Sequence, residues 1–285
     1  MIGPRHLLLF AALLSGCGTD PTELAHTGET ETRSTTSSAS FDPANTGRVT
    51  GQLKWSGRLP DVPPISYAVP KIDAPGFDTN TTPNPNLPQI NVTTQAIGDA
   101  VVFLRNVDPA TARPWDLPPV SVSIGNQQIT VTQGAHRGRV GFVHSGDSVT
   151  MASIEPTFHI LRGRGDGFFS VVFPSPNEPV SRTLKQTGRI ELSSGTGLSW
   201  MRADLFVSDH PYYALTDSDG RFTFDRVPVG KTELVVWLPN WEAGLPIREP
   251  ESSIIARQTY APPIERATPL TITRGQVTEL DVSLP

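Results

Sequence analysis

The sequence predicts an all-β fold made of two β-sandwich domains. Of its 285 residues, 24 are Gly and 28 are Pro, which is typical of many short strands joined by turns. After about residue 45 the apolar segments either alternate with polar residues or form short β-branched runs, and none follows the helical period over a long stretch. With 37% apolar and 18% charged residues, the chain has enough apolar side chains for packed cores.

The charge distribution argues against nucleic acid as a partner. The 23 basic and 28 acidic residues give a net charge of -5. The sequence contains no run of Lys and Arg that could follow a phosphate backbone. We therefore expect no nucleic-acid binding.

The N-terminal residues predict export. Arg5 and His6 precede the apolar run Leu7–Leu14, which is far too short to span a bilayer but suits the core of a signal peptide. Cys17 follows shortly after this run. It is the single cysteine of the chain, so no intramolecular disulfide can form.

Leu14-Ser15-Gly16-Cys17 resembles the lipobox of bacterial lipoproteins, in which a leucine and two small residues precede the modified cysteine. The resemblance implies a lipoprotein signal peptide over residues 1–16, acylation of Cys17 that includes palmitate, and a lipid anchor in the bacterial cell envelope. Within that family, Gly18 rather than Asp favours the outer membrane. The alternative is an ordinary secretory signal peptide followed by an unmodified thiol.

Residues 17–45 predict a disordered tether. They are rich in Thr, Ser and Glu and contain almost no large apolar side chains. Such a segment cannot bury enough surface to offset the entropy lost on ordering.

Two strands and a long loop are expected in residues 46–117. The alternation in Gly47–Trp55 and the apolar run in Asp99–Val107 predict strands. The segment Leu59–Asn91 is rich in Pro, so we expect it to be an extended loop without regular elements.

A series of short strands is expected in residues 118–211. Gly, Asn, Asp or Pro separates the segments, as is typical of a sandwich. The Gly-rich stretch Leu161–Phe169 is expected to be a loop. The expected strands are SVSI, QITVT, RVGFV, DSVTMAS, FFSVVF, GRIEL and MRADLFV.

The C-terminal segment carries a family motif around a turn. Asp219-Gly220 is a tight-turn signal between alternating segments and predicts a hairpin. The surrounding residues resemble the carboxypeptidase regulatory-like family, a prealbumin-type β-sandwich. The residues that match its pattern are Thr216, Asp217, Gly220, Phe222, Val227, Pro228 and Gly230.

The first half of the same family pattern occurs far upstream. Gly47–Gly51 and Ala100–Leu104 supply its first two strands, and Pro269–Pro285 supplies its last. The resemblance therefore implies one discontinuous regulatory-like domain, residues 46–117 and 212–285, into which residues 118–211 are inserted as a second domain.

The insert resembles the cupredoxins of bacterial envelopes that are fused to regulatory-like domains. The matching residues are Gly146, Val149, His159, Trp200, Met201, Asp209, His210, Pro211 and Tyr212. By this resemblance, the stretch SSGTGLSWM (residues 193–201) replaces the copper loop.

The resemblance leaves an incomplete set of copper ligands. Gly195 stands where the family has its cysteine, and Leu198 stands where it has its second histidine. His159 and Met201 remain, whereas a blue-copper site needs a thiolate and two imidazoles. We therefore expect a cupredoxin-like sandwich with a vestigial copper loop and without metal or other cofactor.

The sequence also lacks motifs of known catalytic sites. It contains no G-x-S-x-G elbow, no H-E-x-x-H pair and no phosphate loop, so we expect no enzyme. Tyr212, Tyr213, Trp237 and Trp241 are candidates for an aromatic surface that binds sugar or peptide. The alternative is that these aromatic side chains close the ends of a sandwich.

Three classes of function stay open. The first is a lipid-anchored cell-envelope protein whose non-catalytic β-sandwich modules have binding or structural roles. The second is a metal-handling or electron-transfer relative of the cupredoxins with a non-standard site. The third is a polysaccharide-binding module. The expected partners are the membrane, through the lipid anchor, and envelope proteins or polysaccharide.

Overall fold

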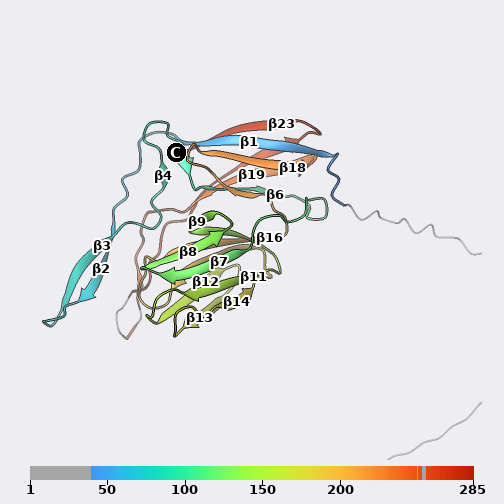
Figure 1. The fold of residues 1–285 in the computed structure, drawn as a ribbon. Helices are drawn as coiled ribbons and strands as arrows, with labels where there is room; N and C mark the ends of the chain where they lie inside the picture. The colour runs from blue at the N-terminus through green and yellow to red at the C-terminus, as the bar shows by residue number, and fades with distance from the viewer. Residues whose placement is uncertain (1–39, 249, 252–254) are drawn as a thin grey trace, which may run out of the picture. The chain divides into compact units, whose positions relative to one another are not determined.

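The structure, a computed structural model, describes residues 40–248, 250–251 and 255–285. In these ranges strands are the regular elements (Figure 1), which confirms the predicted all-β class. No helix in the described ranges is long and apolar enough to cross a membrane. The predicted signal peptide, Cys17 and most of the predicted tether lie outside the described residues.

Strands from both ends of the described chain share one pair of sheets. In sheet I, β1 lies between β18, to which it is antiparallel, and β23, to which it is parallel. Sheet II has the order β17-β6-β19-β22 and is antiparallel throughout. The strands are β1 (Thr46–Trp55), β6 (Val101–Arg105), β17 (Tyr213–Leu215), β18 (Arg221–Pro228), β19 (Gly230–Leu238), β22 (Ile264–Ile272) and β23 (Val277–Leu284).

The alternation of β1 arises from the core between sheets I and II. Val49, Leu53 and Trp55 are buried in this core together with side chains of β6 and β19. Gly51 lies where β1 passes closest to its neighbours. A Cβ atom there would lie 2.0 Å from the carbonyl oxygen of Leu280 and 2.5 Å from the Phe222 ring, so any larger residue would push the strands apart.

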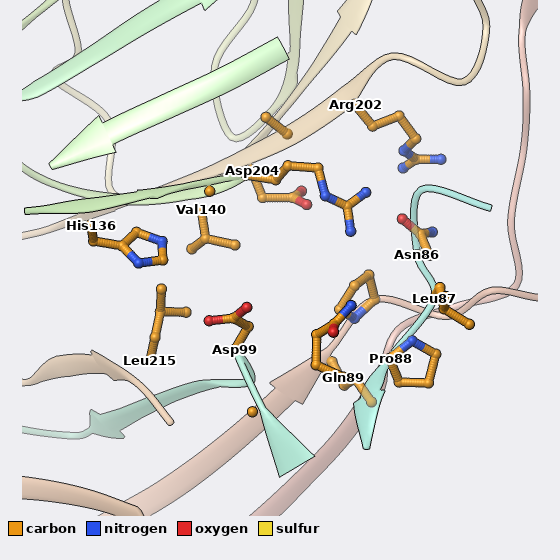
Figure 2. A pocket seen from close by; sticks show the side chains of 16 residues that line it. Asn86, Leu87, Pro88, Gln89, Asp99, His136, Val140, Arg202, Asp204 and Leu215 are labelled. Atoms are coloured by element: carbon orange, nitrogen blue, oxygen red, sulfur yellow. The ribbon is translucent and has the colours of Figure 1, made fainter. Parts of the chain in front are cut away.

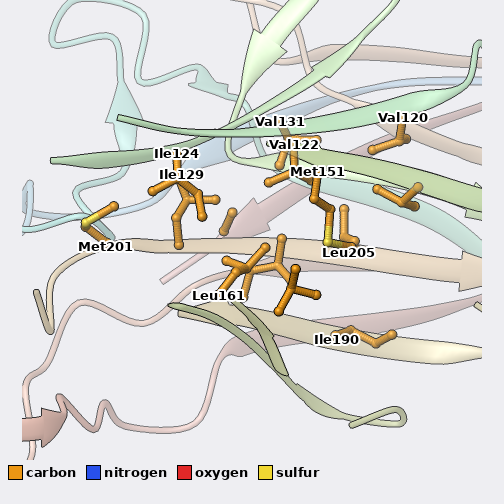
Figure 3. Close-up of a cluster of buried hydrophobic side chains, with 14 of the residues drawn as sticks. Val120, Val122, Ile124, Ile129, Val131, Met151, Leu161, Ile190, Met201 and Leu205 are labelled. Atoms are coloured by element: carbon orange, nitrogen blue, oxygen red, sulfur yellow. The ribbon is translucent and has the colours of Figure 1, made fainter. Parts of the chain in front are cut away.

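The second pair of sheets comes from residues 120–208. Sheet III has the order β14-β11-β7-β8-β9, and sheet IV has the order β10-β16-β15-β12-β13. Figure 3 shows the apolar core of this sandwich, to which Met151, Leu161 and Leu205 contribute. The strands are β7 (Val120–Gly125), β8 (Gln128–Gln133), β9 (His136–Gly138), β10 (Val140–His144), β11 (Ser148–Ser153), β12 (His159–Gly165), β13 (Phe169–Phe173), β14 (Val180–Thr183), β15 (Gly188–Ser194) and β16 (Arg202–Ser208).

Sheet II packs against sheet IV through an aromatic contact. Trp237 of β19 meets Phe206 of β16 edge to face, with 5.2 Å between ring centroids, and both side chains are buried. Val101 of β6 and Phe142 of β10 complete this small buried cluster. Residues 38–285 form one compact unit, so the two sandwiches share this contact within a single body.

The expectation of an extended loop in Leu59–Asn91 is wrong. This segment contains an antiparallel hairpin of β2 (Ile65–Pro70) and β3 (Phe77–Thr82), and the short strand β4 (Gln89–Ile90) pairs with β5 (Ile97–Gly98) (Figure 1). Most of these prolines lie outside the two strands of the hairpin, and Pro70 is the last residue of β2, so the interior of the ladder contains no proline. Another small hairpin joins β20 (Ile247–Arg248) to β21 (Ile255–Arg257).

The expectation of a loop at Leu161–Phe169 is also wrong, because Leu161–Gly165 belong to β12 and Phe169 begins β13. Gly163 lies opposite Phe169 on β13, and a Cβ atom at Gly163 would lie 2.4 Å from the Phe169 ring. The aromatic ring therefore occupies the space of the missing side chain. This cross-strand packing stabilises a strand that contains two glycines.

The turn at Asp219-Gly220 forms as predicted but does not close a hairpin. β17 pairs within sheet II and β18 pairs within sheet I, so the turn links the two sheets of one sandwich. Gly220 has φ 73° and donates to the Asp217 carbonyl at 2.8 Å. The Asp217 carboxylate accepts from the backbone of Asp219 at 2.9 Å and of Arg221 at 2.8 Å.

Candidate functional site

The predicted vestigial copper loop lies at one end of sheet IV. The backbone N–H of Gly195 donates to the Ile160 carbonyl at 2.7 Å, which places the loop beside His159 at the start of β12. Met201 is buried in the core of the sandwich. Leu198 is only half-buried against that core, so its truncation to Ala should cost less than the 2–5 kcal/mol typical of fully buried leucines.

The side chains at these positions do not fit a copper centre. His159 is buried, and its Nε2 lies 2.8 Å from Oε1 of Glu155, within hydrogen-bond distance. Gly195 and Leu198 provide no ligand atom. Within the described ranges, no group of three or more His, Cys, Asp or Glu residues is arranged to hold a metal ion.

Two of the four residues of the candidate aromatic surface are buried. Tyr212 and Trp237 are 0% and 3% exposed, so neither ring face is open to a sugar or a peptide. The Tyr212 hydroxyl donates to the Arg226 carbonyl at 2.7 Å. Tyr213 is half-buried and stacks on Phe103, while Trp241 is half-buried against Trp55. Tyr213 and Trp241 therefore keep some accessible ring area while they pack against the cores.

A cavity of about 150 Å³ lies where sheet II meets the edge of sheet IV. We call it the junction cavity. Figure 2 shows the carboxylates of Asp99 and Asp204, the guanidinium of Arg202 and the ring of His136 around the same space. Arg139, which directly precedes β10, also lines the cavity. The junction cavity therefore combines cationic, anionic and neutral polar groups.

Two of these groups belong to a buried ion-pair network on β15 and β16. Asp204 accepts from Arg189 at 2.9 Å, and Arg202 donates to Glu191 at 2.5 Å. Glu191 also accepts from Arg257 at 3.2 Å, and all of these carboxylates are buried. Burial raises the pKa of Asp204, while the nearby Arg189 and Arg202 oppose that shift.

Two of these arginines, Arg189 and Arg202, pack against aromatic rings. The Arg189 guanidinium lies 4.9 Å from the centre of the Trp237 ring, and that of Arg202 lies 4.3 Å from the centre of the Tyr260 ring. Burial raises the pKa of Tyr260 to about 12, so the ring stays neutral beside these cations. Cation–π contacts of this kind fix the guanidinium planes in place.

Arg139 differs from its neighbours because its side chain has no hydrogen-bond or ion-pair partner among the described residues. Burial lowers its pKa, and the charge of Asp204 only partly offsets that cost. A desolvated cation without a partner is costly, since buried charges are normally paired. The junction cavity therefore contains a guanidinium that is available for an anion.

A second, open pocket of about 470 Å³ lies along β16 and β6 and includes His210. The His210 ring is 9% exposed and stacks on Tyr213 with 5.7 Å between centroids. Burial lowers its pKa to about 4, and Asp209 opposes this shift. His210 is therefore neutral in the folded protein near pH 7.

The arginines of this region were not among the residues singled out from the sequence. A signal for them exists in GRIEL and MRADLF, where charged residues alternate with apolar ones along predicted strands. Alternation places Arg189 and Glu191 on one face of β15, and Arg202 and Asp204 on the same face of β16. Charged residues on one face of a strand usually indicate solvent, whereas here Glu191, Arg202 and Asp204 are buried and Arg189 is half-buried.

Comparisons with known proteins do not identify a family or a ligand for this chain. No protein-family model and no curated protein sequence matches this chain. Among solved structures it is similar to a methionine-to-alanine variant of amicyanin in the Cu(I) form, with 19% identity over 32% of this chain and 82% of that chain and a TM-score of 0.25. It is also similar to a reduced tryptophan-to-tyrosine variant of amicyanin, with 18% identity over 38% of this chain and 98% of that chain and a TM-score of 0.25. Similarity at this level says nothing about ligand or activity.

Proposed function

We propose that this chain is a lipid-anchored, non-catalytic protein of the bacterial cell envelope that binds an anionic ligand in the junction cavity. The observation that supports the binding role most strongly is Arg139, a desolvated guanidinium that lines the cavity without a hydrogen-bond or ion-pair partner. The lipobox-like residues before Cys17 support the anchor.

The charges around the junction cavity favour a monoanion. Arg202 is neutralised by Glu191 and Asp204 by Arg189, so these two pairs contribute little net charge. Arg139 is left as one uncompensated cation, with the exposed Asp99 at the mouth of the cavity. A second negative charge on the ligand would find no second uncompensated cation in the cavity and would be repelled by Asp99. A carboxylate, which a guanidinium binds through two parallel hydrogen bonds, satisfies these conditions.

The remaining lining groups favour a ligand that also carries hydroxyl groups. Asp99 and Asp204 accept hydrogen bonds, and the exposed Gln89 can donate and accept. Hydroxyl groups beside a carboxylate are characteristic of sugar acids. The ligand class that fits the junction cavity is therefore a uronic acid, either free or as one unit of a polysaccharide.

Isothermal titration of the folded chain with galacturonate at low ionic strength tests the binding role. We expect saturable binding with a Kd of about 1 mM, typical of one small group held by few contacts, and no binding of galactose. Arg139→Gln should abolish binding. Arg137→Gln, which changes an exposed arginine close by, is the matched control and should bind as wild type does.

The free energy of unfolding of Arg139→Gln distinguishes a binding role of Arg139 from a structural role. Because the wild-type guanidinium is desolvated and unpaired, Arg139→Gln should unfold with a free energy equal to or above that of wild type. Binding that persists in Arg139→Gln, or the absence of galacturonate binding in a folded wild-type protein, would contradict the proposal.

A further inference from the structure

The face of sheet IV that carries Arg202 and Asp204 continues beyond the junction cavity. Ser193 of β15 lies opposite Arg202 on one side and Arg162 of β12 on the other. Glu191 lies opposite Asp204 and Arg164 in the same way. Two parallel rows of side chains therefore cross β16, β15 and β12 on one face of the sheet.

This face holds an excess of arginine. We call it the arginine face and define it by Arg162, Arg164, Arg189, Glu191, Ser193, Arg202 and Asp204, with Arg257 above Glu191. Five guanidinium groups thus lie beside two carboxylates, although the whole chain has a net charge of -5. Glu191, Ser193, Arg202 and Asp204 are buried, so an anionic partner would meet the cationic excess at the half-buried arginines, which are Arg162, Arg164, Arg189 and Arg257.

The end of the arginine face on β12 has cations that are free to bind. Arg164 donates to the Ser193 hydroxyl at 3.1 Å and has no ion pair, and the side chain of Arg162 has neither a hydrogen bond nor an ion pair among the described residues. Burial lowers the pKa of Arg164, and repulsion from Arg162 and Arg257 lowers it further. Glu191 partly opposes this shift, but neither guanidinium forms an ion pair with a carboxylate among the described residues.

The two positions with unpaired guanidinium groups lie at the two edges of the arginine face: Arg139 lines the junction cavity beside Arg202 and Asp204, and Arg162 and Arg164 lie on β12. Arg139 precedes β10, and β10, β16, β15 and β12 are consecutive neighbours in sheet IV. With about 4.8 Å between neighbouring strands, β10, which Arg139 precedes, and β12, which carries Arg162 and Arg164, are about 14 Å apart across the sheet. Arg257, whose side chain is 33% exposed, lies between them above Glu191.

We propose that the arginine face and the junction cavity together bind a linear acidic polysaccharide, with one uronic-acid unit in the cavity at Arg139 and a second held by Arg162 and Arg164. This proposal rests on the binding role of the junction cavity and extends it from one sugar acid to a chain. A ligand that bridges both positions gains affinity because its second contact is intramolecular.

Other linear polyanions fit this face less well. Single-stranded nucleic acid needs open aromatic rings on which bases stack, whereas Trp237 is buried under Arg189 and Tyr260 is covered by Arg202. An acidic peptide lacks hydroxyl groups for the acceptors of the cavity, Asp99 and Asp204. A polysaccharide supplies both carboxylates and hydroxyls along its length.

Titration of the full folded chain with galacturonate, trigalacturonate and hexagalacturonate tests the extension. We expect hexagalacturonate to bind at least about tenfold more tightly than galacturonate. The double variant Arg162→Gln/Arg164→Gln should lose that gain and keep the wild-type affinity for galacturonate, because the cavity is unchanged. Arg137→Gln should behave as wild type, and thermal unfolding followed by circular dichroism verifies that each variant is folded.

The outcomes separate the two proposals. Equal affinity for the monosaccharide and the hexamer, with both lost in Arg139→Gln, would overturn the extension and leave the cavity as a site for a single sugar acid. No binding of either ligand would overturn both. Binding of a hexaglutamate peptide or of single-stranded DNA as tight as that of hexagalacturonate would also overturn the extension, because it would mean that charge alone is recognised.

Discussion

The Glu191 carboxylate accepts a hydrogen bond from the Arg202 guanidinium at 2.5 Å, and both side chains are only 9% exposed. The same carboxylate accepts from Arg257 at 3.2 Å and from Arg189 at 3.5 Å. One buried anion thus holds three cations from different parts of the chain. The arginine face depends on this carboxylate, whereas Arg139 and Arg162 have no such partner.

Replacement of Glu191 by Gln should therefore be strongly destabilising. It leaves the buried Arg202 without its counter-charge, and removal of one partner from a buried pair costs about 3–5 kcal/mol. Urea unfolding of wild type and variant measures the difference. Asp225→Asn, which removes the exposed ion pair between Arg48 and Asp225, is the control and should cost less than about 1 kcal/mol. Equal effects of the two substitutions would show that Glu191 is not the centre of the network.

His210 should make the protein less stable at mildly acidic pH. Its pKa is lowered to about 4 in the folded state, so the unfolded chain takes up the proton first as the pH falls below about 6.5. The stabilisation is complete above pH 6.5 and is lost progressively towards pH 4. Between pH 7 and pH 5 we expect a loss of about 2 kcal/mol in the free energy of unfolding.

Urea unfolding at these two pH values measures this loss. His210→Phe keeps an aromatic ring beside Tyr213 but cannot be protonated. In this variant the loss of unfolding free energy between pH 7 and pH 5 should be smaller by about 2 kcal/mol. A pH dependence in His210→Phe that is identical to that of wild type would assign the effect to other groups.

A fragment of residues 212–285 should not unfold cooperatively. It lacks β1, which lies between β18 and β23, and β6, which lies between β17 and β19. Both remaining sheets would lose an internal strand together with buried residues such as Leu53 and Leu104. Thermal unfolding followed by circular dichroism should show a broad, non-cooperative change. A sharp two-state transition would show that the C-terminal segment folds alone and that the predicted discontinuous domain is wrong.

Cys17 should carry the membrane anchor. In cells fed radiolabelled palmitate, the wild-type protein should be labelled and should sediment with membranes, because acyl chains bury many methylene groups in the bilayer. Cys17→Ser should remain unlabelled and soluble after cell lysis. Label retained in Cys17→Ser would contradict acylation at this residue.

Strand positions were easier to predict than the candidate site. Alternation identified β7, β8, β10, β11, β13, β15 and β16, because each of these strands buries one face in a core. A high content of Pro and Gly led to two wrong predictions of loops. Whether a strand tolerates these residues depends on their position in the ladder and not on their number. The β2–β3 hairpin tolerates prolines at its ends, and β12 tolerates Gly163 because the Phe169 ring covers it.

The junction cavity could not be predicted from local patterns. Arg139 and Asp99 lie far apart in the sequence and meet only because sheet II packs on sheet IV. The copper-loop resemblance concerns residues 193–201, which end directly before Arg202, but the loop residues themselves do not line the cavity. Local alternation shows that Arg189 and Arg202 face one side, but it does not show what covers that side.

The ¹⁵N NMR signal of the arginine Nε–Hε groups during titration with galacturonate tests the role of Arg139 most directly. One cross-peak, absent from the spectrum of Arg139→Gln, should shift with saturation as galacturonate is added and should not move with galactose. A shift of all arginine signals in proportion to concentration, or no shift of the Arg139 signal, would contradict anion binding in the junction cavity.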